Sequence, residues 1–520
     1  MRQKTLSVCF LLALNICLQG QRSFAAVKPH ALISESMVLQ EGMKVPIWGT
    51  ADDGEKVTIR FQGQEVSATA KDGKWLVHLE ELKAGGPFEM TIAGSNTIHF
   101  KNVLVGEVWV CSGQSNMEFQ LRSSAEPEKV IAESKNPMIR LFTVPKTPAS
   151  APQHRVQGKW QICGPDTAAS FSAVAYFFGR DLQHARHVPV GLIHTSWGGT
   201  PAESWTSLPA LEAESSLKYL AEQQIRALGD YPQSIDKYIA DLTKYRQEIS
   251  QIDATKHDLP SPAGPPANPA RNAWGASTLY NGMIASLIPY AIRGAIWYQG
   301  ESNAGRAHEY RTLLPTMIKN WRTDWQQGDF PFLIVQLAPF TKILPEPGES
   351  DWAELREAQL HTTQVLPNVA QAVITDVGSE GDIHPRWKEP VGSRLALAAR
   401  ALAHGEKIEY SGPVYESLHV EGSKAILSFQ HLGGGLVAKE GALTGFTIAG
   451  ADRKFVKADA DIHGDHVIVW SPKVEQPVAV RFGWANYPVV NLWNKAGLPA
   501  TPFRTDDFPI VTEHHKRVNR

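Results

Sequence analysis

The sequence has little cysteine and almost no net charge. Four cysteines occur in 520 residues, and 51 Lys and Arg side chains stand against 53 Asp and Glu side chains, so the formal net charge is -2. A chain without an excess of either charge has no global field that would attract nucleic acid, an anionic membrane or a polyanion. We therefore expect a small or neutral ligand and no nucleic-acid partner.

Long apolar runs are also scarce, and the one at the N-terminus is too short to span a bilayer. It covers residues 6–18, follows a short basic start and precedes small residues that are typical of a cleavage site. We predict a signal peptide over residues 1–25, bacterial export to the periplasm or the medium, and no membrane association after its removal. Export would permit a disulfide between the two remaining cysteines, Cys111 and Cys163, but the sequence does not place them within bonding distance.

The rest of the chain divides into three regions with different patterns of apolar residues. Residues 26–101 contain short alternating runs separated by Asp-Gly pairs, which predict antiparallel hairpins and a small β-sandwich-like domain. Residues 102–406 alternate continuous apolar runs with helical patterns, which indicates an α/β domain with a doubly wound parallel sheet. Residues 407–520 return to short β-runs and predict a second sandwich-like domain. A long connection at about 207–274 has a polar helical stretch and a proline-rich end, which favours a lid, an insertion or a partner surface.

The α/β region offers recognisable strands and helices. Its continuous apolar runs are VLVGEVWV, VPVGLIH, IRGAIWY, FPFLIVQL and NVAQAVIT. Residues 309–327 carry apolar side chains at intervals of three and four, which predicts a helix with one buried face. The members of that face are Leu313, Leu314, Met317, Ile318, Trp321 and Trp325. A further helix is predicted after Pro390.

The first candidate for chemistry is Ser115, in the segment GQSNM after the first apolar run. A serine here lies at the carboxyl end of a parallel strand and at the start of a helix, where open α/β sheets bind ligands and free N–H groups stabilise an anion. A serine in this position is also a common helix cap, so the position alone does not establish catalysis. Ser112 is an alternative nucleophile, although its place before Gly113 favours a turn.

Three other segments bring polar residues to the same edge of the predicted sheet. SWGGT supplies a glycine pair, QGESN supplies an amide and a carboxylate, and DVGSEGDIHP supplies three acids and a histidine. Because the carboxyl ends of parallel strands meet at one edge, we expect these segments to form one site with Ser115. We expect Gln114, Gln299 and Glu301 to contact the substrate.

Serine and histidine in one site point to acyl transfer. An imidazole can take the serine proton and return it near neutral pH, so we predict Ser115 as the nucleophile and His384 as the general base. The oxyanion that forms needs hydrogen-bond donors. The candidates are the N–H of Ser115, a glycine N–H of Gly198 or Gly199, and the amide of Asn303.

The segments GQSNM, SWGGT, WYQGESN and DIHP-x-x-K resemble the sialate O-acetylesterase group of SGNH (GDSL-like) hydrolases, and the resemblance covers nearly the whole chain after the signal. It implies a flavodoxin-like catalytic sheet and the same roles for Ser115, His384, Asn303 and the glycine pair. It also implies removal of O-acetyl groups from sialic acid, with the 9-O-acetyl ester as the expected target. The reaction would pass through an acetyl-enzyme and need no metal or other cofactor.

The acidic partner of His384 stays open. SGNH hydrolases usually carry Asp three residues before the histidine, where this sequence has Gly381. Asp382 lies two residues before it and could reach the imidazole from an extended segment, or it could only stabilise a turn. Glu380, Asp376 or a backbone carbonyl are alternatives, and some enzymes of this group use a Ser-His dyad.

Two other functions remain open at this stage. The catalytic loops would recognise the acetyl ester more than the sugar, so an acetylesterase for a polysaccharide such as xylan is an alternative. A carbohydrate-binding protein without turnover is another, since the 15 tryptophans offer faces for sugars. His194 is predicted to be a packed residue, and Lys388 and Arg386 are candidates for contact with a substrate carboxylate. The sequence does not predict the oligomeric state.

Overall fold

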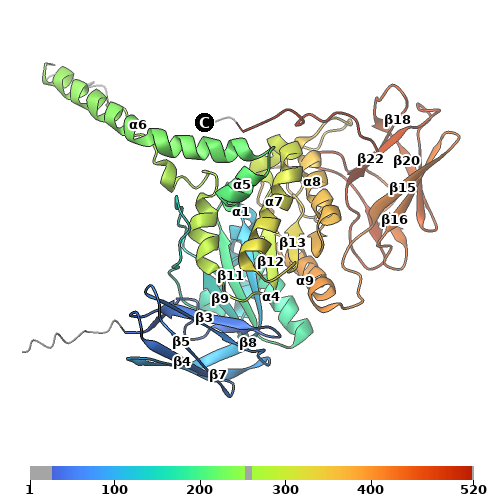
Figure 1. Cartoon of the computed structure of the whole chain (residues 1–520). Coiled ribbons are helices and arrows are strands. Elements are labelled where there is room, and N and C mark those ends of the chain that lie inside the picture. Colours follow the sequence, from blue (N-terminus) through green and yellow to red (C-terminus); the bar gives the residue numbers. More distant parts are fainter. Residues whose placement is uncertain (1–25, 252–260, 518–520) are drawn as a thin grey trace, which may run out of the picture.

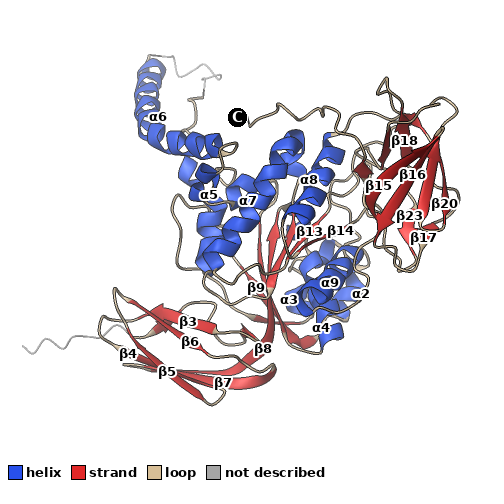
Figure 2. Cartoon of the chain, turned by 45° about the vertical axis from the view of Figure 1, so that its right-hand side comes forward, coloured by secondary structure: helices blue, strands red, loops and turns tan. Residues whose placement is uncertain are grey.

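The computed structural model describes residues 26–251 and 261–517 (Figure 1). The predicted signal peptide, residues 1–25, lies outside the described residues. In the described part of the chain, no helix is both long enough and apolar enough to cross a membrane. A β-layer near the N-terminus, a central α/β body and a β-domain near the C-terminus follow one another along the molecule (Figure 2).

The central sheet confirms the predicted doubly wound α/β class. The five apolar runs form parallel strands, which are β8 (Thr97–Gly113), β11 (Val190–Ser196), β12 (Gly294–Tyr298), β13 (Phe332–Val335) and β14 (Val369–Ala372). Their order is β11-β8-β12-β13-β14, which is the flavodoxin-like arrangement. Two strands that the sequence did not predict, β9 (Asn136–Thr143) and β10 (Gln161–Cys163), extend the sheet beyond β11.

Helices cover both faces of this sheet (Figure 1). On one face lie α4 (Ala173–Arg186) and α9 (Glu389–His404), and on the other lie α7 (Ala307–Trp325) and α8 (Asp351–Val365). Successive strand residues point to opposite faces, so Val110 packs with α7 while Cys111 packs with α4 and α9. The predicted apolar face of α7 is buried, and the helix expected after Pro390 is α9. Short helices fill the connections, namely α2 (Pro127–Ala132) and α3 (Pro165–Ala168).

The N-terminal β-layer is continuous with the central sheet. The first half of β8 pairs with β7 (Gly85–Ala93) and β2 (Val38–Gln40), and its second half pairs with β11 and β12. The other strands of the layer are β1 (Lys28–Pro29), β3 (Val45–Thr50), β4 (Lys56–Phe61), β5 (Gln64–Thr69) and β6 (Lys74–Leu79). The boundary predicted after residue 101 therefore falls inside a single strand.

The C-terminal β-domain begins after α9. One sheet has the order β15-β16-β21-β20 and another the order β19-β18-β22-β24, with the pair β17-β23 beside them. These strands are β15 (Val414–Glu421), β16 (Lys424–Gln430), β17 (Leu436–Ala438), β18 (Phe446–Ala449), β19 (Val456–Lys457), β20 (Asp459–His463), β21 (His466–Trp470), β22 (Ala479–Phe482), β23 (Leu492–Asn494) and β24 (Phe503–Arg504).

The last described residues leave this domain and return to the α/β body (Figure 1). The Thr512 hydroxyl donates a 2.6 Å hydrogen bond to Glu354 of α8. Arg517 reaches Glu203, which lies beside the candidate site, with Nη1 and Oε1 3.1 Å apart. The final described segment of the domain predicted over residues 407–520 therefore packs against the catalytic body, because the buried carboxylates of Glu354 and Glu203 accept its hydrogen bonds.

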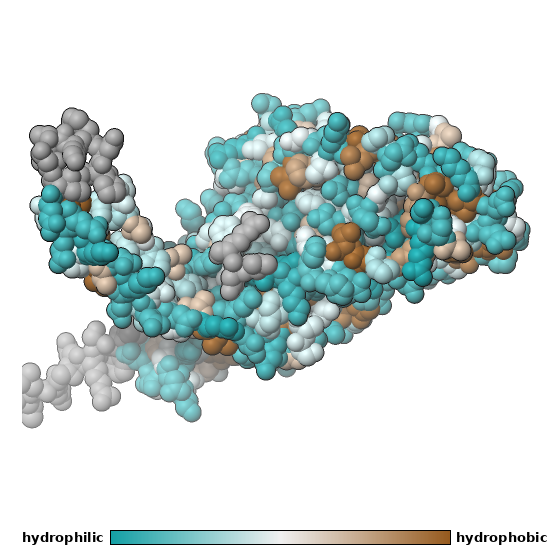
Figure 3. Space-filling model, turned by 90° about the horizontal axis from the view of Figure 1, so that it is seen from above, coloured by the Kyte–Doolittle hydropathy of each residue, from teal (hydrophilic) through white to brown (hydrophobic). Residues whose placement is uncertain are grey.

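The long connection at 207–274 is an insertion that projects from the body. It holds α5 (Leu208–Ala213) and the 33-residue helix α6 (Lys218–Ser250), whose far half extends away from the rest of the molecule (Figures 1 and 3). Figure 2 shows a bend in α6, and Pro232 inside the helix accounts for it because proline removes a hydrogen bond and crowds the preceding turn. Residues 261–268 are irregular, as their prolines predict.

Candidate active site

The structure brings Ser115 and His384 together at the carboxyl edge of the central sheet. Ser115 is the first residue of the short helix α1 (Ser115–Glu118), directly after β8. Its Oγ lies 2.8 Å from Nε2 of His384. Gly113 makes the sharp exit from β8 with φ +139, and a Cβ there would lie 2.1 Å from the carbonyl oxygen of Tyr298, so only glycine fits. Two predicted residues 269 positions apart thus form a hydrogen-bonded pair.

The surroundings of His384 favour a neutral imidazole. Its side chain is 36% exposed and stacks on the ring of Phe119, with ring centroids 6.5 Å apart. Burial lowers the pKa of His384 below its usual 6.5, the nearby cation of Lys388 lowers it further, and Asp382 opposes both. A neutral ring at neutral pH is the form that can accept the proton of Ser115.

Of the acidic candidates, Asp382 is the one that lies against His384. Its Oδ1 accepts a 2.8 Å hydrogen bond from the His384 backbone N–H and lies 3.6 Å from Nδ1 of the ring. Asp376 accepts hydrogen bonds from both terminal guanidinium nitrogens of Arg394, and Glu380 accepts one from the backbone N–H of Ile343. Asp382 therefore holds a turn and also places a charge near the imidazole, but its 55% exposure weakens that charge.

The opposite effects of Lys388 and Asp382 predict opposite shifts in the pH profile. The reaction needs neutral His384, so kcat/KM falls as the pH drops through the pKa of this residue. Lys388→Gln removes the cation that lowers this pKa, so the acid limb moves to higher pH. Asp382→Asn removes the anion that raises it, so the limb moves to lower pH.

The same two variants differ in rate at the plateau of the profile. We expect Asp382→Asn to cost about 10²-fold, well below the roughly 10⁴-fold cost of removing a buried triad aspartate, because the ring nitrogen is 3.6 Å away. Profiles of kcat/KM against pH for both variants measure these effects. Limbs that move in the same direction would contradict the charge assignment.

The oxyanion candidates differ in how free their N–H groups are. Ser115 stands at the first helical position, where the backbone N–H has no partner within the helix. The N–H of Gly198 donates to Oε2 of Glu118 at 2.7 Å, so an oxyanion would have to displace that carboxylate. Gly198 also lies so close to the nucleophile that a Cβ on it would be 3.2 Å from Cβ of Ser115. Gly199, with φ +73, follows in the same loop.

Asn303 lies at the centre of a buried polar cluster. Its Nδ2 donates to Glu203 at 3.0 Å, and its Oδ1 accepts from Gln299 Nε2 at 2.6 Å. Glu203 is in turn paired with Arg306 at 2.7 Å and with the tail residue Arg517. Two cations and the amide lower the pKa of Glu203 against the effect of its burial. One N–H of the Asn303 side-chain amide donates to Glu203. Because the amide group is planar, this contact also fixes the direction of its second N–H.

The side chains of Gln114 and Gln299 are buried and hold neighbouring loops together. Gln114 is buried, and its Oε1 accepts the backbone N–H groups of Gly300 and Ser302 at 3.3 and 3.4 Å. Gln299 is buried and accepts a 2.8 Å hydrogen bond from the Tyr310 hydroxyl while it donates to Asn303. Protein groups use both ends of the Gln299 amide and Oε1 of Gln114, which gives these side chains a positioning role, while their contact with a substrate stays a prediction.

A buried network that includes Glu301 lies behind the catalytic pair. Asn116 Nδ2 donates to Glu301 Oε1 at 2.6 Å and to the carbonyl of Ile383 at 3.0 Å, next to His384. Lys388 donates to Oδ1 of Asn116 at 2.5 Å. Burial lowers the pKa of Lys388 to about 7 and raises the pKa of Glu301. Lys388 is thus unable to meet a substrate carboxylate, since it is fully enclosed.

Arg386, the other candidate for a substrate carboxylate, is engaged by the backbone. Its guanidinium donates to the carbonyl oxygens of Ser123 and Ser124, at 3.1 Å each. His194 is buried beside Ser196 at 2.6 Å, and burial lowers its pKa to about 4, in agreement with the expected packed residue. These contacts hold loops in place and leave Ser115 with one histidine partner.

The remaining candidates from the sequence are the two cysteines and Ser112, and the structure shows the surroundings of each. Within the described residues, Cys111 and Cys163 are free and buried thiols, so the permitted disulfide is not formed. The Ser112 hydroxyl is buried in β8 and has no hydrogen-bond partner among the described groups. Among residues 26–251 and 261–517, no three His, Cys, Asp or Glu side chains are grouped as metal ligands would be.

Two residues near the site had no signal in the sequence. Trp274, at the end of the insertion, is 48% exposed and donates from Nε1 to the carbonyl oxygen of Gly199 at 2.7 Å. Glu118 binds Lys146 at 2.6 Å as well as the N–H of Gly198. Neither position follows from a local motif, because each depends on a loop that is distant in sequence.

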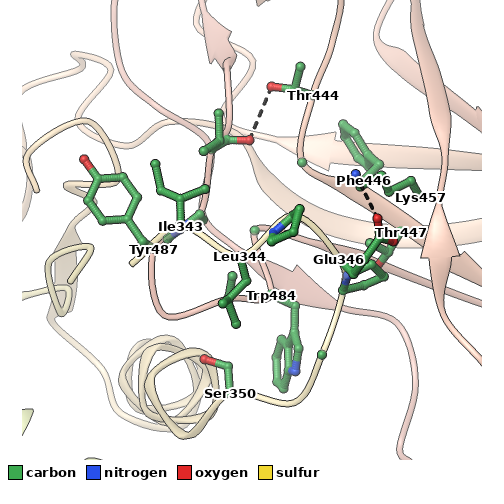
Figure 4. Close-up of a pocket in the computed structure, with 18 of the residues that line it drawn as sticks. Ile343, Leu344, Glu346, Ser350, Thr444, Phe446, Thr447, Lys457, Trp484 and Tyr487 are labelled. Atoms are coloured by element: carbon green, nitrogen blue, oxygen red, sulfur yellow. Dashed lines mark hydrogen bonds and ion pairs between the residues drawn. The ribbon is translucent and has the colours of Figure 1, made fainter. Parts of the chain in front are cut away.

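A separate cavity of about 540 Å³ lies where residues 342–350 meet the C-terminal β-domain (Figure 4). Its walls include Ile343, Leu344, Phe446, Trp484 and Tyr487. The bond from Ile343 to Glu380 ties this loop to the segment that carries His384. Ser115 and His384 are not among the described residues that line this cavity, so the cavity is distinct from the catalytic pair.

Comparison with known proteins agrees with the motifs and the geometry. A family described as carbohydrate esterase, sialic acid-specific acetylesterase matches residues 105–228 and 269–399. Sialate O-acetylesterase of Rattus norvegicus is 30% identical over 443 residues, which cover 77% of this chain and 78% of the relative. The enzyme of the same name from Homo sapiens is 31% identical over 439 residues, 77% of this chain and 75% of the relative.

A solved structure extends the likeness to the whole fold. The crystal structure described as a novel carbohydrate acetylesterase from Xanthomonas citri has a TM-score of 0.79 and 36% identity, and it covers 93% of this chain and 100% of its own. The match includes the flanking β-domains as well as the catalytic sheet, because so little of either chain is left out. On this combined ground, the chain belongs to the sialic acid-specific acetylesterase family of carbohydrate esterases.

Proposed function

We propose that this protein is a serine esterase that hydrolyses O-acetyl esters of sialic acid, with the 9-O-acetyl group as its preferred target. The observation that carries the proposal is the 2.8 Å contact between Oγ of Ser115 and Nε2 of His384 in a chain of this family. A carbohydrate-binding protein without turnover would have no use for this contact, so the non-catalytic alternative is not retained.

The geometry supports a two-step mechanism. Nε2 of His384 takes the proton from Ser115 as Oγ attacks the acetyl carbonyl carbon, and the N–H of Ser115 and the amide of Asn303 receive the oxyanion. The tetrahedral intermediate collapses, His384 returns the proton to the sugar oxygen, and the sugar leaves an acetyl-Ser115. Water then attacks with His384 again as the base, and acetate leaves as the serine regains its proton.

One observation favours a second substrate, the acetylated neutral polysaccharide. The basic residues that the sequence offered for the carboxylate of sialic acid are engaged by the protein, since Lys388 is enclosed and the exposed Arg386 donates from two of its three guanidinium nitrogens to carbonyl oxygens. Exposed indoles, by contrast, lie at two catalytic loops: Trp274 of the insertion donates to Gly199, and Trp387 lies three residues after His384. Indole faces stack on sugar rings without needing a charge.

A direct comparison of acetate release separates these substrates. We expect kcat/KM for 9-O-acetylated sialic acid to exceed that for acetylated xylan by at least about 10-fold, because contacts that are specific to one sugar typically give a preference of this size. Acetate released by the purified protein measures both, and a chelator such as EDTA serves as the control and should change neither. Higher kcat/KM on acetylated xylan would replace the sialic acid assignment with the polysaccharide one.

We further propose that the protein acts outside the cytoplasm of a bacterium. The support is the basic, apolar and small-residue pattern of residues 1–25.

A further inference from the structure

The residue after the nucleophile, Asn116, is completely buried and lies where three segments of the active site meet. Its amide contacts the segment of His384, the segment of Asn303 and the buried amine of Lys388, which are distant from it in sequence. A side chain without exposed surface does not touch the substrate. Any effect of Asn116 on the reaction therefore passes through the groups that it holds.

Both amide hydrogens and the amide oxygen of Asn116 are engaged. Nδ2 donates to Oε1 of Glu301 at 2.6 Å and to the carbonyl oxygen of Ile383 at 3.0 Å, and Oδ1 accepts from Nζ of Lys388 at 2.5 Å. An asparagine supplies two N–H donors and one acceptor oxygen in a single plane. The partners are two acceptors and one donor, so they fix the orientation of the amide, because a flipped amide would turn its N–H groups toward the lysine.

The contact with Ile383 acts on His384 through the peptide group between these two residues. The carbonyl oxygen of this peptide accepts from Asn116, while its N–H belongs to His384 and donates to Oδ1 of Asp382 at 2.8 Å. A peptide group is planar, so hydrogen bonds at both of its ends fix the plane and with it the direction in which the histidine side chain leaves the backbone. In this direction Nε2 lies 2.8 Å from Oγ of Ser115.

Lys388 supports the imidazole from a second side. Its Nζ, which holds Oδ1 of Asn116, also lies 4.8 Å from the ring centroid of Phe119. The ring of Phe119 stacks on the imidazole of His384, with centroids 6.5 Å apart. One buried amine thus contacts both groups that border the base, namely the amide that binds the preceding peptide and the ring on which the imidazole stacks.

We propose that Asn116 is the positioning residue that sets the distance between the nucleophile and the base. Because Asn116 directly follows the nucleophile on α1, its hydrogen bond to the carbonyl of Ile383 ties the backbone of the serine to that of the histidine. Its hydrogen bond to Glu301 ties both to the helical turn that carries the oxyanion donor Asn303. This inference rests on the esterase mechanism proposed above and is independent of the sugar.

Asn116→Asp tests the proposal, because a carboxylate has the same shape as the amide but no N–H to donate. The variant sets oxygen atoms against the carbonyl of Ile383 and the carboxylate of Glu301. We expect kcat to fall about 10²-fold while KM stays within about 3-fold, since a misplacement of about 1 Å costs this much in the chemical step and the substrate contacts are unchanged. Hydrolysis of a small acetyl ester such as para-nitrophenyl acetate measures both constants without involving the sugar.

The matched control is Asn320→Asp in α7. Asn320 is also buried and also donates from Nδ2 to a carboxylate at 2.6 Å, that of Asp324, while its Oδ1 accepts the backbone N–H of Ser207. The control loses the same kind of donor and should lower the melting temperature as Asn116→Asp does, but it should leave kcat within about 2-fold. Equal losses of kcat in the two variants would mean that destabilisation alone slows the enzyme, and the proposal would fail.

The double variant Asn116→Asp with Glu301→Gln separates the two contacts of Nδ2. An amide at position 301 can donate to a carboxylate at position 116, so this hydrogen bond returns with its donor reversed, while the carbonyl of Ile383 still lacks its donor. We expect the melting temperature to recover and kcat to stay at least about 10-fold below that of Glu301→Gln alone. A kcat equal to that of Glu301→Gln would overturn the proposal, because the contact with Ile383 would then have no effect.

Ser115→Ala, measured beside these variants, separates this inference from the proposed function. Full activity in Ser115→Ala would refute the esterase mechanism itself. An inactive Ser115→Ala together with a fully active Asn116→Asp would refute only the positioning role of Asn116.

Discussion

Replacing Ser115 with alanine is expected to reduce kcat for acetate release by about 10³- to 10⁶-fold. The hydroxyl is the nucleophile in the proposed mechanism, and its Oγ contacts His384. The cap of α1 is Gln114, so Ser115 is inside the helix and its loss does not remove a capping bond. The effect should therefore fall on the chemical step and leave the fold intact.

The matched control for this change is Ser112→Ala, three residues earlier. The Ser112 hydroxyl is buried and has no hydrogen-bond partner among the described groups, so its removal should leave kcat within about 2-fold and stability within about 1 kcal/mol. Kinetics with an acetylated sugar and thermal unfolding of both variants measure the contrast. Retained activity in Ser115→Ala, or its loss in Ser112→Ala, would move the nucleophile elsewhere.

Replacing His384 with alanine is expected to cost as much as the loss of the serine, about 10³- to 10⁶-fold in kcat, because the two groups act as one unit. The double variant with Ser115→Ala should be no slower than either single variant, since removing either group already disables the pair. His194→Gln is the control, because that side chain serves Ser196 inside the fold. Additive losses in the double variant would contradict the pairing of Ser115 with His384.

The catalytic pair was predictable because position along a strand is a local property. A continuous apolar run marks a strand that is buried on both faces, and the loop after it begins at the carboxyl edge of the sheet, which placed Ser115 after β8 and the His384 segment after β14 on one side. Strand β9 was missed because its sequence contains Pro137 and the buried Arg140, which break the apolar run. Arg140 is accommodated by Asn102, 38 residues away, which no local pattern reveals.

The direction of polar side chains was not predictable in the same way. Gln114 and Gln299 lie at the expected edge, but they point into contacts between loops that are up to 188 positions apart. Lys388 was a candidate for contact with a substrate carboxylate, yet it is buried and donates to Asn116 of the nucleophile segment. Burial of an amide or a cation depends on which distant partner satisfies it, and that information lies in the assembled fold.

The ion pair between Arg517 and Glu203 makes the C-terminal segment part of the electrostatics of the candidate site. Glu203 is buried, accepts a hydrogen bond from the Asn303 amide, and is paired with Arg306 and with Arg517, which lies 314 positions away in sequence. Burial raises the pKa of Glu203, and the two cations more than offset that effect. A change that detaches the segment from the α/β body would therefore remove one of the two charges that keep the carboxylate beside Asn303 ionised, although the substitution itself would lie far from Ser115 in the sequence.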